Sequence, residues 1–226
     1  MPEPAGVGGR CVLVAGATST SGDAAVRALV AGGATVIAVG RDEDRLAPLR
    51  ARGGRTAVCD LTDEASVRAL ADELHREGLR VDGILHLVGG WRGGGGIAGQ
   101  SDADYRALEG GLTALRHVSR AFWDDLVAAP AARTAIVSST AVARPLAGGA
   151  NYAAVKAAEE AWARAMAQGF AKAADAGASA AALRAASVIF RVRSLAGLED
   201  DLAAAFVGLW DAEASAVNDQ VIALGA

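Results

Sequence analysis

The sequence predicts an α/β fold, with one doubly wound parallel sheet of about seven strands and helices on both of its faces. Short apolar strand segments alternate with helical segments along the 226 residues of the chain. The strand segments are continuously apolar, which is typical of parallel strands that are covered on both faces. Right-handed crossovers between such strands then place helices on either side of a single sheet.

The strands are expected where short apolar runs lie between glycine, aspartate and other turn residues. They are residues 10–15, 34–40, 56–60, 83–88 and 134–139, a segment within 179–190, and residues 220–224. No break in composition marks a second domain, so a single domain over residues 10–226 is predicted, preceded by a flexible lead-in at residues 1–9.

Helices are expected between these strands, with side chains at their starts that accept hydrogen bonds from free backbone N–H groups. Asp42 is suited to cap the second helix, and Thr62 or Asp63 the third. A glycine-rich loop, GGWRGGGGIAGQ, covers residues 89–100. The expected helices are residues 22–31, 42–53, 63–77, 102–128 and 199–212. A further helix carries Tyr152 and Lys156 and runs to about residue 176.

Composition and charge exclude several classes of function. The net charge of −4 gives no reason to expect a nucleic-acid partner. No apolar run approaches the ~20 residues that span a bilayer, and residues 1–9 lack the features of a signal peptide. Cys11 and Cys59 lie at strand edges and are expected to be buried thiols in the cytoplasm. The three histidines show no metal-ligand spacing, so no metal is predicted.

A glycine turn joins the first strand to the first helix. Gly16 and Gly22 flank Ala17, Thr18, Ser19, Thr20 and Ser21. In a doubly wound sheet, this turn is where a dinucleotide pyrophosphate binds, because backbone N–H groups and the helix dipole point at the phosphates. The alternative interpretation is an ordinary strand–helix loop with a serine N-cap.

The end of the second strand bears on the choice of dinucleotide. An acidic side chain there would accept hydrogen bonds from a ribose 2′-hydroxyl, but this chain has Gly40 followed by Arg41. An arginine suits a 2′-phosphate, so NADP(H) is preferred, while NAD(H) stays possible. Arg41 is alternatively a solvated side chain at a helix start. Asp60 is suited either to accept from the adenine amino group or to cap a helix.

Three residues predict the chemistry. Tyr152 and Lys156 are one helical turn apart, so their side chains share a helix face. The chain has only two tyrosines, and lysine is rare among its cationic side chains. Ser139 ends the apolar run before this helix. A compact ammonium beside a phenol favours the phenolate form and makes the phenol a better proton donor.

These motifs together resemble the short-chain dehydrogenase/reductase family from Arg10 to Leu224. The resemblance implies a Rossmann-like fold and an oxidoreductase acting on a carbonyl or alcohol group. It makes Tyr152 the general acid or base, Lys156 the residue that assists Tyr152 and binds the nicotinamide ribose, and Ser139 the donor to the substrate oxygen. The implied cofactor-binding residues are Gly16, Thr18, Ser19, Thr20, Ser21, Gly22, Arg41, Asp60, Leu61, Gly89, Tyr152 and Lys156.

The sequence also departs from the family pattern. Thr20 and Ser21 replace a usual glycine and an apolar residue, which predicts a differently shaped phosphate loop. Residues 86–89 read HLVG where the family often has Asn-Asn-Ala-Gly, and the family's relay asparagine has no counterpart near residues 110–111. These departures leave open a catalytically silent dinucleotide-binding sensor or scaffold. An epimerase or dehydratase on the same fold is a third possibility.

The substrate side is expected around the glycine-rich loop. Trp91 is suited to cover a flat or apolar substrate, and Arg92 to meet an anionic group, although Trp91 is equally suited to pack on a neighbouring helix. The segment GGWRGG at residues 89–94 resembles the corresponding loop of dihydropteridine reductases. The short connection after the sixth strand predicts an abbreviated lid and an open site. Relatives assemble through the two long helices, so a homodimer or homotetramer is expected.

Overall fold

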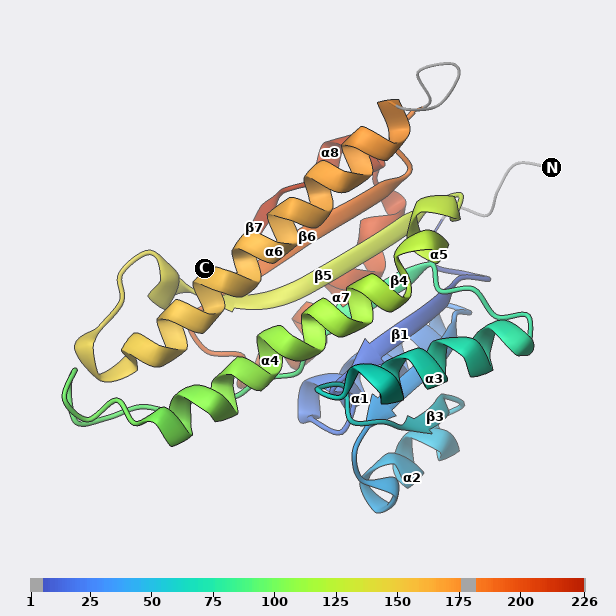
Figure 1. Cartoon of the computed structure of the whole chain (residues 1–226). Helices are drawn as coiled ribbons and strands as arrows, with labels where there is room; N and C mark the ends of the chain where they lie inside the picture. The colour runs from blue at the N-terminus through green and yellow to red at the C-terminus, as the bar shows by residue number, and fades with distance from the viewer. Residues whose placement is uncertain (1–5, 176–181, 226) are drawn as a thin grey trace.

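The predicted fold class is confirmed. The structure is a computed structural model that describes residues 6–175 and 182–225. Seven parallel strands form one sheet in the order β3-β2-β1-β4-β5-β6-β7 (Figure 1). The strands are β1 (Cys11–Ala15), β2 (Thr35–Gly40), β3 (Arg55–Val58), β4 (Gly83–His86), β5 (Ala132–Ser139), β6 (Ala185–Val192) and β7 (Val221–Ala223).

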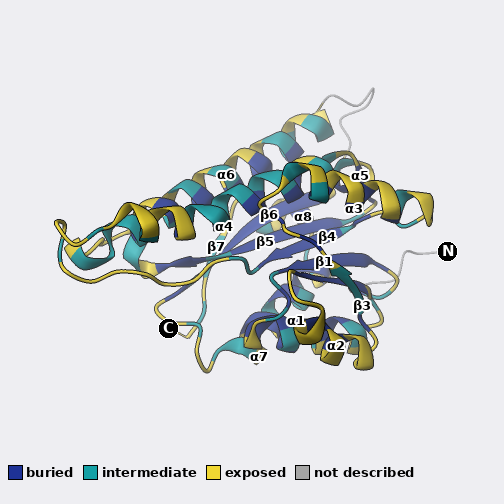
Figure 2. Cartoon of the chain, turned by 60° about the horizontal axis from the view of Figure 1, so that its bottom comes forward, coloured by how far each residue is buried: buried dark blue, intermediate teal, exposed yellow. Residues whose placement is uncertain are grey.

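Helices cover both faces of this sheet (Figures 1 and 2). One layer consists of α1 (Thr20–Ala31), α2 (Glu43–Ala51) and α7 (Glu199–Val207). The other layer consists of α3 (Glu64–Arg76), α4 (Asp102–Ala121), α5 (Trp123–Ala128) and α6 (Ala150–Asp175). The short helix α8 (Ala214–Val217) leads into β7. None of the helices in the described ranges is long and apolar enough to cross a membrane.

The continuous apolarity of the strands is explained by two cores, one on each face. Successive side chains of a strand point to opposite faces. In β1, Leu13 packs among the side chains of α3, α4 and α6, whereas Val12 and Val14 pack among those of α1, α2 and α7. Every residue of β1 is buried, because neither face of the sheet meets solvent there.

Helix starts follow the predicted capping chemistry. The Asp42 carboxylate accepts from Arg45 N at 3.2 Å, and the Asp63 carboxylate accepts from Ser66 N at 3.0 Å. Of the two candidates for the cap of α3, the structure therefore selects Asp63. Helix α1 begins at Thr20, two residues earlier than expected, because the Ser19 hydroxyl caps it by accepting from Gly22 N at 3.0 Å.

Other boundaries differ from the expectation. The segment 102–128 contains two helices, since Phe122 leaves helical geometry and buries its ring in the core. Residues 6–9 of the expected lead-in pack against the domain, with Val7 buried and Gly9 N donating to Gly33 O. Residues 1–5, the expected helix end at 176 and residues 179–181 lie outside the described residues.

Parallel strands bring their carboxyl ends to one edge of the sheet. The chain leaves β1 and β4 at this edge and continues in opposite directions along the strand order, since β1 leads toward β2 and β4 leads toward β5. Ligands of doubly wound sheets bind outside the strand ends at this switch point. The glycine turn, Arg41 and Ser139 all follow or end strands at this edge.

Candidate active site

Three connected hollows form a groove at this edge of the sheet. We call them the first, central and outer hollows, with cavity volumes of about 310, 260 and 810 Å³. The first and central hollows share Ser19, Leu87, Val88 and Gly89 as lining residues. The central and outer hollows share Tyr152, Arg193, Ser194 and Leu195. The groove therefore runs from the end of β2 past Tyr152 to the loops beyond β5.

The glycine turn forms one wall of the first hollow. Gly16 has φ +81°, and a Cβ there would lie 2.9 Å from the carbonyl carbon of Leu87. At Gly22 a Cβ would lie 2.2 Å from Ala17 O. Both positions need glycine, one for its backbone conformation and both for the close approach of neighbouring backbone. The turn is thus built so that the start of α1 lies tightly against the end of β1.

Thr20 and Ser21 are accommodated in this turn without strain. Among the described residues other than glycine, only Asp219 has a positive φ, so neither residue needs left-handed backbone. Both belong to the first turn of α1. The Ser19 hydroxyl donates to Gly16 O at 3.2 Å while it accepts from Gly22 N, which fixes the turn from both sides.

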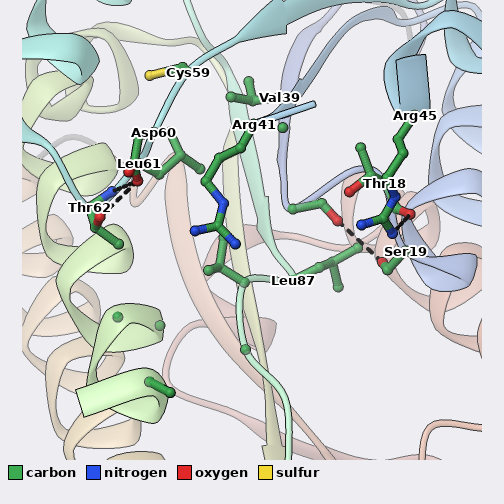
Figure 3. A pocket seen from close by; sticks show the side chains of 17 residues that line it. Thr18, Ser19, Val39, Arg41, Arg45, Cys59, Asp60, Leu61, Thr62 and Leu87 are labelled. Carbon is green, nitrogen blue, oxygen red and sulfur yellow. Dashed lines mark hydrogen bonds between the residues drawn. The ribbon is translucent and has the colours of Figure 1, made fainter. Parts of the chain in front are cut away.

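Polar side chains from the ends of β2 and β3 line the first hollow. Figure 3 shows Arg41 extending between Asp60 and Thr62 on one side and Thr18 and Ser19 on the other. Arg45 donates to Thr18 O at 2.9 Å. Arg41 is exposed and has no hydrogen bond or ion pair with any side chain that the structure describes. Arg41 is therefore available to an anionic ligand, whereas Arg45 stabilises the glycine turn through its hydrogen bond to Thr18 O.

Asp60 is held in a local turn and does not cap α3. Its Oδ1 accepts from Thr62 N at 2.9 Å and from the Thr62 hydroxyl at 2.7 Å. These hydrogen bonds are the main reason that the pKa of Asp60 lies below its ordinary value, with a smaller contribution from the Arg41 charge. Leu61 is buried and lines the same hollow. The carboxylate is thus charged and positioned at the hollow.

The predicted chemical residues meet where the central and outer hollows join. Tyr152 lines both, Lys156 lines the central one and Ser139 the outer one. Ser139 is the last residue of β5, and its Oγ accepts from Ala141 N at 3.1 Å. Because that bond uses Oγ as the acceptor, the hydroxyl proton stays available to a substrate oxygen.

Lys156 is held by two acceptors. Its Nζ donates to Val137 O at 2.9 Å and to Glu159 Oε2 at 2.7 Å, and its side chain is 11% exposed. An ammonium has three N–H donors, so one remains for the groove. Gly89, predicted to bind cofactor, is next to this ammonium, since a Cβ there would lie 3.5 Å from Nζ.

Glu159 is a site residue that the sequence analysis did not single out. Its side chain is 1% exposed, and burial raises the pKa of this carboxyl, although the Lys156 ammonium opposes the shift. A Cβ at Gly111 of α4 would lie 2.9 Å from Glu159 Oε1. The ion pair therefore fits beside α4 only because position 111 has no side chain. The sequence feature that could have identified Glu159 is its position three residues after Lys156, on the same face of a helix.

His86 is a second buried polar residue near this ion pair. It is 2% exposed, and its Nε2 donates to Gly111 O at 3.1 Å, which leaves Nδ1 as an acceptor without a partner among the described residues. Burial, reinforced by the Lys156 charge, lowers the pKa of His86 to about 3. His86 is therefore a neutral imidazole in the wall of the central hollow.

The glycine-rich loop contributes to the outer hollow. Trp91 lines it and is 67% exposed, so the ring does not pack on a neighbouring helix. Arg92 is exposed but is not part of the lining. Residues 193–198 connect β6 to α7, and the first three of them line the hollow. No group of three or more potential metal ligands occurs among the described residues.

Known proteins share this fold and sequence pattern. Residues 10–174 match the family described as short chain dehydrogenase. A curated relative named as a daunorubicin C-13 ketoreductase of Streptomyces sp. (strain C5) is 37% identical over 92 residues, which cover 38% of this chain and 32% of that protein. The matched segment thus spans about a third of that relative's length.

Two solved structures illustrate the likeness in three dimensions. Gluconate 5-dehydrogenase from Burkholderia cenocepacia J2315, in complex with NADP and tartrate, is 22% identical with a TM-score of 0.79, covering 96% of this chain and 94% of that chain. NAD⁺-bound xylitol dehydrogenase is 16% identical with a TM-score of 0.81, covering 96% and 98% respectively. At such identities the likeness shows the fold alone.

The family match spans most of the chain and therefore decides the class. This protein belongs to the short-chain dehydrogenase/reductase family. Its parallel sheet with helices on both faces is a Rossmann-like fold, shared with both solved enzymes.

Proposed function

We propose that this chain is an NADP(H)-dependent oxidoreductase that interconverts a small carbonyl compound and its alcohol, with Tyr152 as general acid or base. The observation that carries the proposal is the groove itself. It joins a hollow with a glycine turn and a free arginine to a hollow that holds Ser139 and Tyr152. One molecule in the first and central hollows would reach the place where a second would meet the phenol.

The residues of the first and central hollows fit a nicotinamide dinucleotide. Gly16, which has no side chain, and the N-terminus of α1 suit its pyrophosphate, and Arg41, which has no ion pair among the described residues, suits a 2′-phosphate. Thr18, Ser19, Thr20, Ser21 and Gly22 complete the phosphate site, with Asp60, Leu61 and Gly89 beside it. The nicotinamide, when bound, supplies or accepts a hydride.

The chain's own residues would position the substrate and move a proton. Ser139 donates its free hydroxyl proton to the substrate oxygen and holds it near Tyr152. Tyr152 gives its phenolic proton to that oxygen during reduction and takes it back during oxidation. The Lys156 ammonium stabilises the phenolate that remains. Glu159 and Val137 O keep that ammonium in place beneath the groove.

A carbonyl panel tests the activity. We expect the purified chain to oxidise NADPH in the presence of at least one aldehyde or ketone, and Tyr152→Phe to bind NADPH but lose more than about 100-fold in kcat, because it lacks the proton donor. Binding of NADPH without turnover of any member of a broad panel would favour the sensor or scaffold.

The cofactor preference has its own test. Arg41→Ala should weaken NADPH much more than NADH, because only NADPH carries the 2′-phosphate. Dissociation constants from the fluorescence of the bound nicotinamide measure both. Equal losses for the two dinucleotides would remove the reason for preferring NADP(H).

A cytoplasmic location is part of the same proposal, consistent with two free, buried cysteines.

A further inference from the structure

The outer hollow has a marked charge pattern. Its volume is about 810 Å³, and Ser139 and Tyr152 are part of its lining. Of the described residues, the only charged side chains that line it are those of Arg144 and Arg193, and none of its lining residues is a carboxylate. This contrasts with the chain as a whole, which has 26 acidic and 22 basic residues. The hollow is therefore a local excess of positive charge at the reacting end of the groove.

In the part of the chain that the structure describes, neither arginine has a hydrogen-bond or ion-pair partner. Arg191, two residues before Arg193, donates to both carboxylate oxygens of Glu160 at 2.8 Å. Arg144 and Arg193 have no hydrogen bond or ion pair with any described residue. Both are exposed at the hollow. Their guanidinium groups are free to pair with an incoming carboxylate, which arginine binds with two parallel hydrogen bonds.

The same hollow has an apolar wall. Trp91 is 67% exposed and Leu146 is 77% exposed, and both line it. They are two of the five large hydrophobic side chains that are exposed in the described part of the chain. Exposed apolar side chains gathered around a hollow are typical of a binding surface.

Hydrogen bonds fix this wall in place. Gly94 N donates to Gly148 O at 2.7 Å. The Gln100 amide donates to Gly94 O at 3.0 Å and to Gly148 O at 3.1 Å, and its oxygen accepts from Asn151 N at 3.1 Å. Gln100 thereby fastens the loop of Trp91 to the segment that follows Leu146. Both loops project beyond the same ends of the strands (Figure 1).

We propose that the outer hollow binds a substrate with a flat apolar body and an anionic carboxylate, and that Arg144 and Arg193 recognise the carboxylate. This inference rests on the proposed function, because it names the substrate class of the same site. Arg144 lines only the outer hollow, whereas Arg193 also lines the central one. Arg144 is therefore the residue that sets the preference for anionic over neutral substrates.

Binding of an unreactive probe tests the inference without any turnover. We expect 2-naphthoate to bind the NADP⁺-loaded chain about 10- to 100-fold more tightly than 2-naphthamide, which has the same body without the charge. Arg144→Gln should remove most of this difference and leave 2-naphthamide unchanged. Arg193→Gln should also weaken 2-naphthoate. Isothermal titration calorimetry measures all five dissociation constants.

Arg76→Gln is the matched control. Arg76 is exposed and unpaired among the described residues, and it ends α3 at the opposite edge of the sheet. Its replacement should leave the preference unchanged. Equal affinities of the parent chain for the two probes, or an Arg144→Gln variant that keeps the preference, would overturn the inference. A turnover panel without any active carbonyl would instead overturn only the proposed function.

Where turnover is found, the same preference should appear in kinetics. An aryl keto acid should have a higher kcat/KM than its methyl ester, and Arg144→Gln should lose this advantage through KM, since the contact with the carboxylate is made in the ground state as well as in the transition state. An ester that is turned over as well as its acid would contradict the inference.

Discussion

Lys156 depends on a carboxylate that water does not reach. The ammonium donates to Glu159 at 2.7 Å, and the glutamate side chain is 1% exposed. Burying two charges costs desolvation, which their attraction offsets only while both partners are present. The pair therefore fixes the position and charge of Lys156 more than it stabilises the fold. Any variant that removes one partner leaves an uncompensated charge beside the central hollow.

The first prediction removes the charge of Glu159 and keeps its shape. Glu159→Gln should destabilise the fold by about 3–5 kcal/mol, because a buried ammonium loses its anionic partner. Activity should fall, and the pH–rate profile should move, since the field at Tyr152 changes. Urea unfolding and a pH series of kcat measure the two effects.

A double variant separates charge from packing. Lys156→Gln with Glu159→Gln removes both charges and should recover much of the stability but none of the activity. If Glu159→Gln is as stable and as active as the parent chain, the pair does not position Lys156.

Sequence spacing could identify Tyr152 and Lys156 but not their surroundings. Four residues in a helix place two side chains on one face, so the pair follows from local geometry. The approach of Gly111 to Glu159 joins two helices that are far apart in sequence. Only the packing of α4 on α6 reveals that the glycine makes room for the carboxylate. The same packing shows that His86 is buried and that only one of its two ring nitrogens has a hydrogen-bond partner among the described residues.

The second prediction concerns His86 and pH. Burial lowers the pKa of folded His86 to about 3, whereas the unfolded histidine titrates near ~6.5. Between these values the unfolded chain binds a proton that the folded chain does not, so stability falls as pH falls. The contribution is about 1.4 kcal/mol per pH unit.

Replacement of the imidazole isolates this contribution. His86→Gln cannot take up the proton, so its unfolding free energy should fall less steeply between pH 6.5 and pH 4 than that of the parent chain. Urea unfolding at several pH values measures both slopes. Parallel slopes would show that His86 becomes protonated in the folded state.

At the scale of elements, α4 and α6 are the two helices that position the side chains of the candidate active site. Helix α6 carries Tyr152, Lys156 and Glu159, and α4 carries the glycine that faces them. The alternation of strands and helices predicted both elements. The break at Phe122 had no signal, since neither proline nor glycine marks it and the helical pattern continues. Tertiary burial of the Phe122 ring decides that boundary.

The third prediction uses two neighbouring glycines of α4. Alanine is a better helix former than glycine by about 1 kcal/mol. Gly110→Ala should therefore stabilise the chain, because the nearest atom to its Cβ would be Thr62 Cγ2 at 3.5 Å. Gly111→Ala should destabilise it, because its Cβ would lie 2.9 Å from Glu159 Oε1 and 3.0 Å from Val88 O.

Thermal unfolding of both variants measures this contrast, and Gly110→Ala serves as the control for helix propensity. Gly111→Ala should also lower kcat, since it displaces the partner of Lys156. Equal stabilisation by the two replacements would mean that α4 moves away from Glu159 at little cost.

At the scale of the whole molecule, part of the surface of α6 carries small apolar side chains that the described chain leaves uncovered. The stripe formed by Ala157, Ala161 and Ala165 on α6 is exposed, whereas Ala153 is buried. A hollow of about 400 Å³ lies beside it and is lined by Ser119, Arg120, Trp123, Trp162, Ala165, Met166 and Gly169. Ala153 is thus covered by the chain's own fold. The other three are available to a second copy of the chain.

The last prediction is that the chain assembles through this α4–α6 face. Small side chains permit close helix contact, and a C2 interface would place the same stripe on both subunits. Ala161→Arg should then convert a dimer or tetramer into a smaller species in sedimentation velocity, because two long cations would meet at the two-fold axis. Ala47→Arg, on an exposed position of α2, is the control and should leave the assembly intact. A parent chain that sediments as a monomer, or an Ala161→Arg variant that keeps its assembly, would show that this face is not the interface.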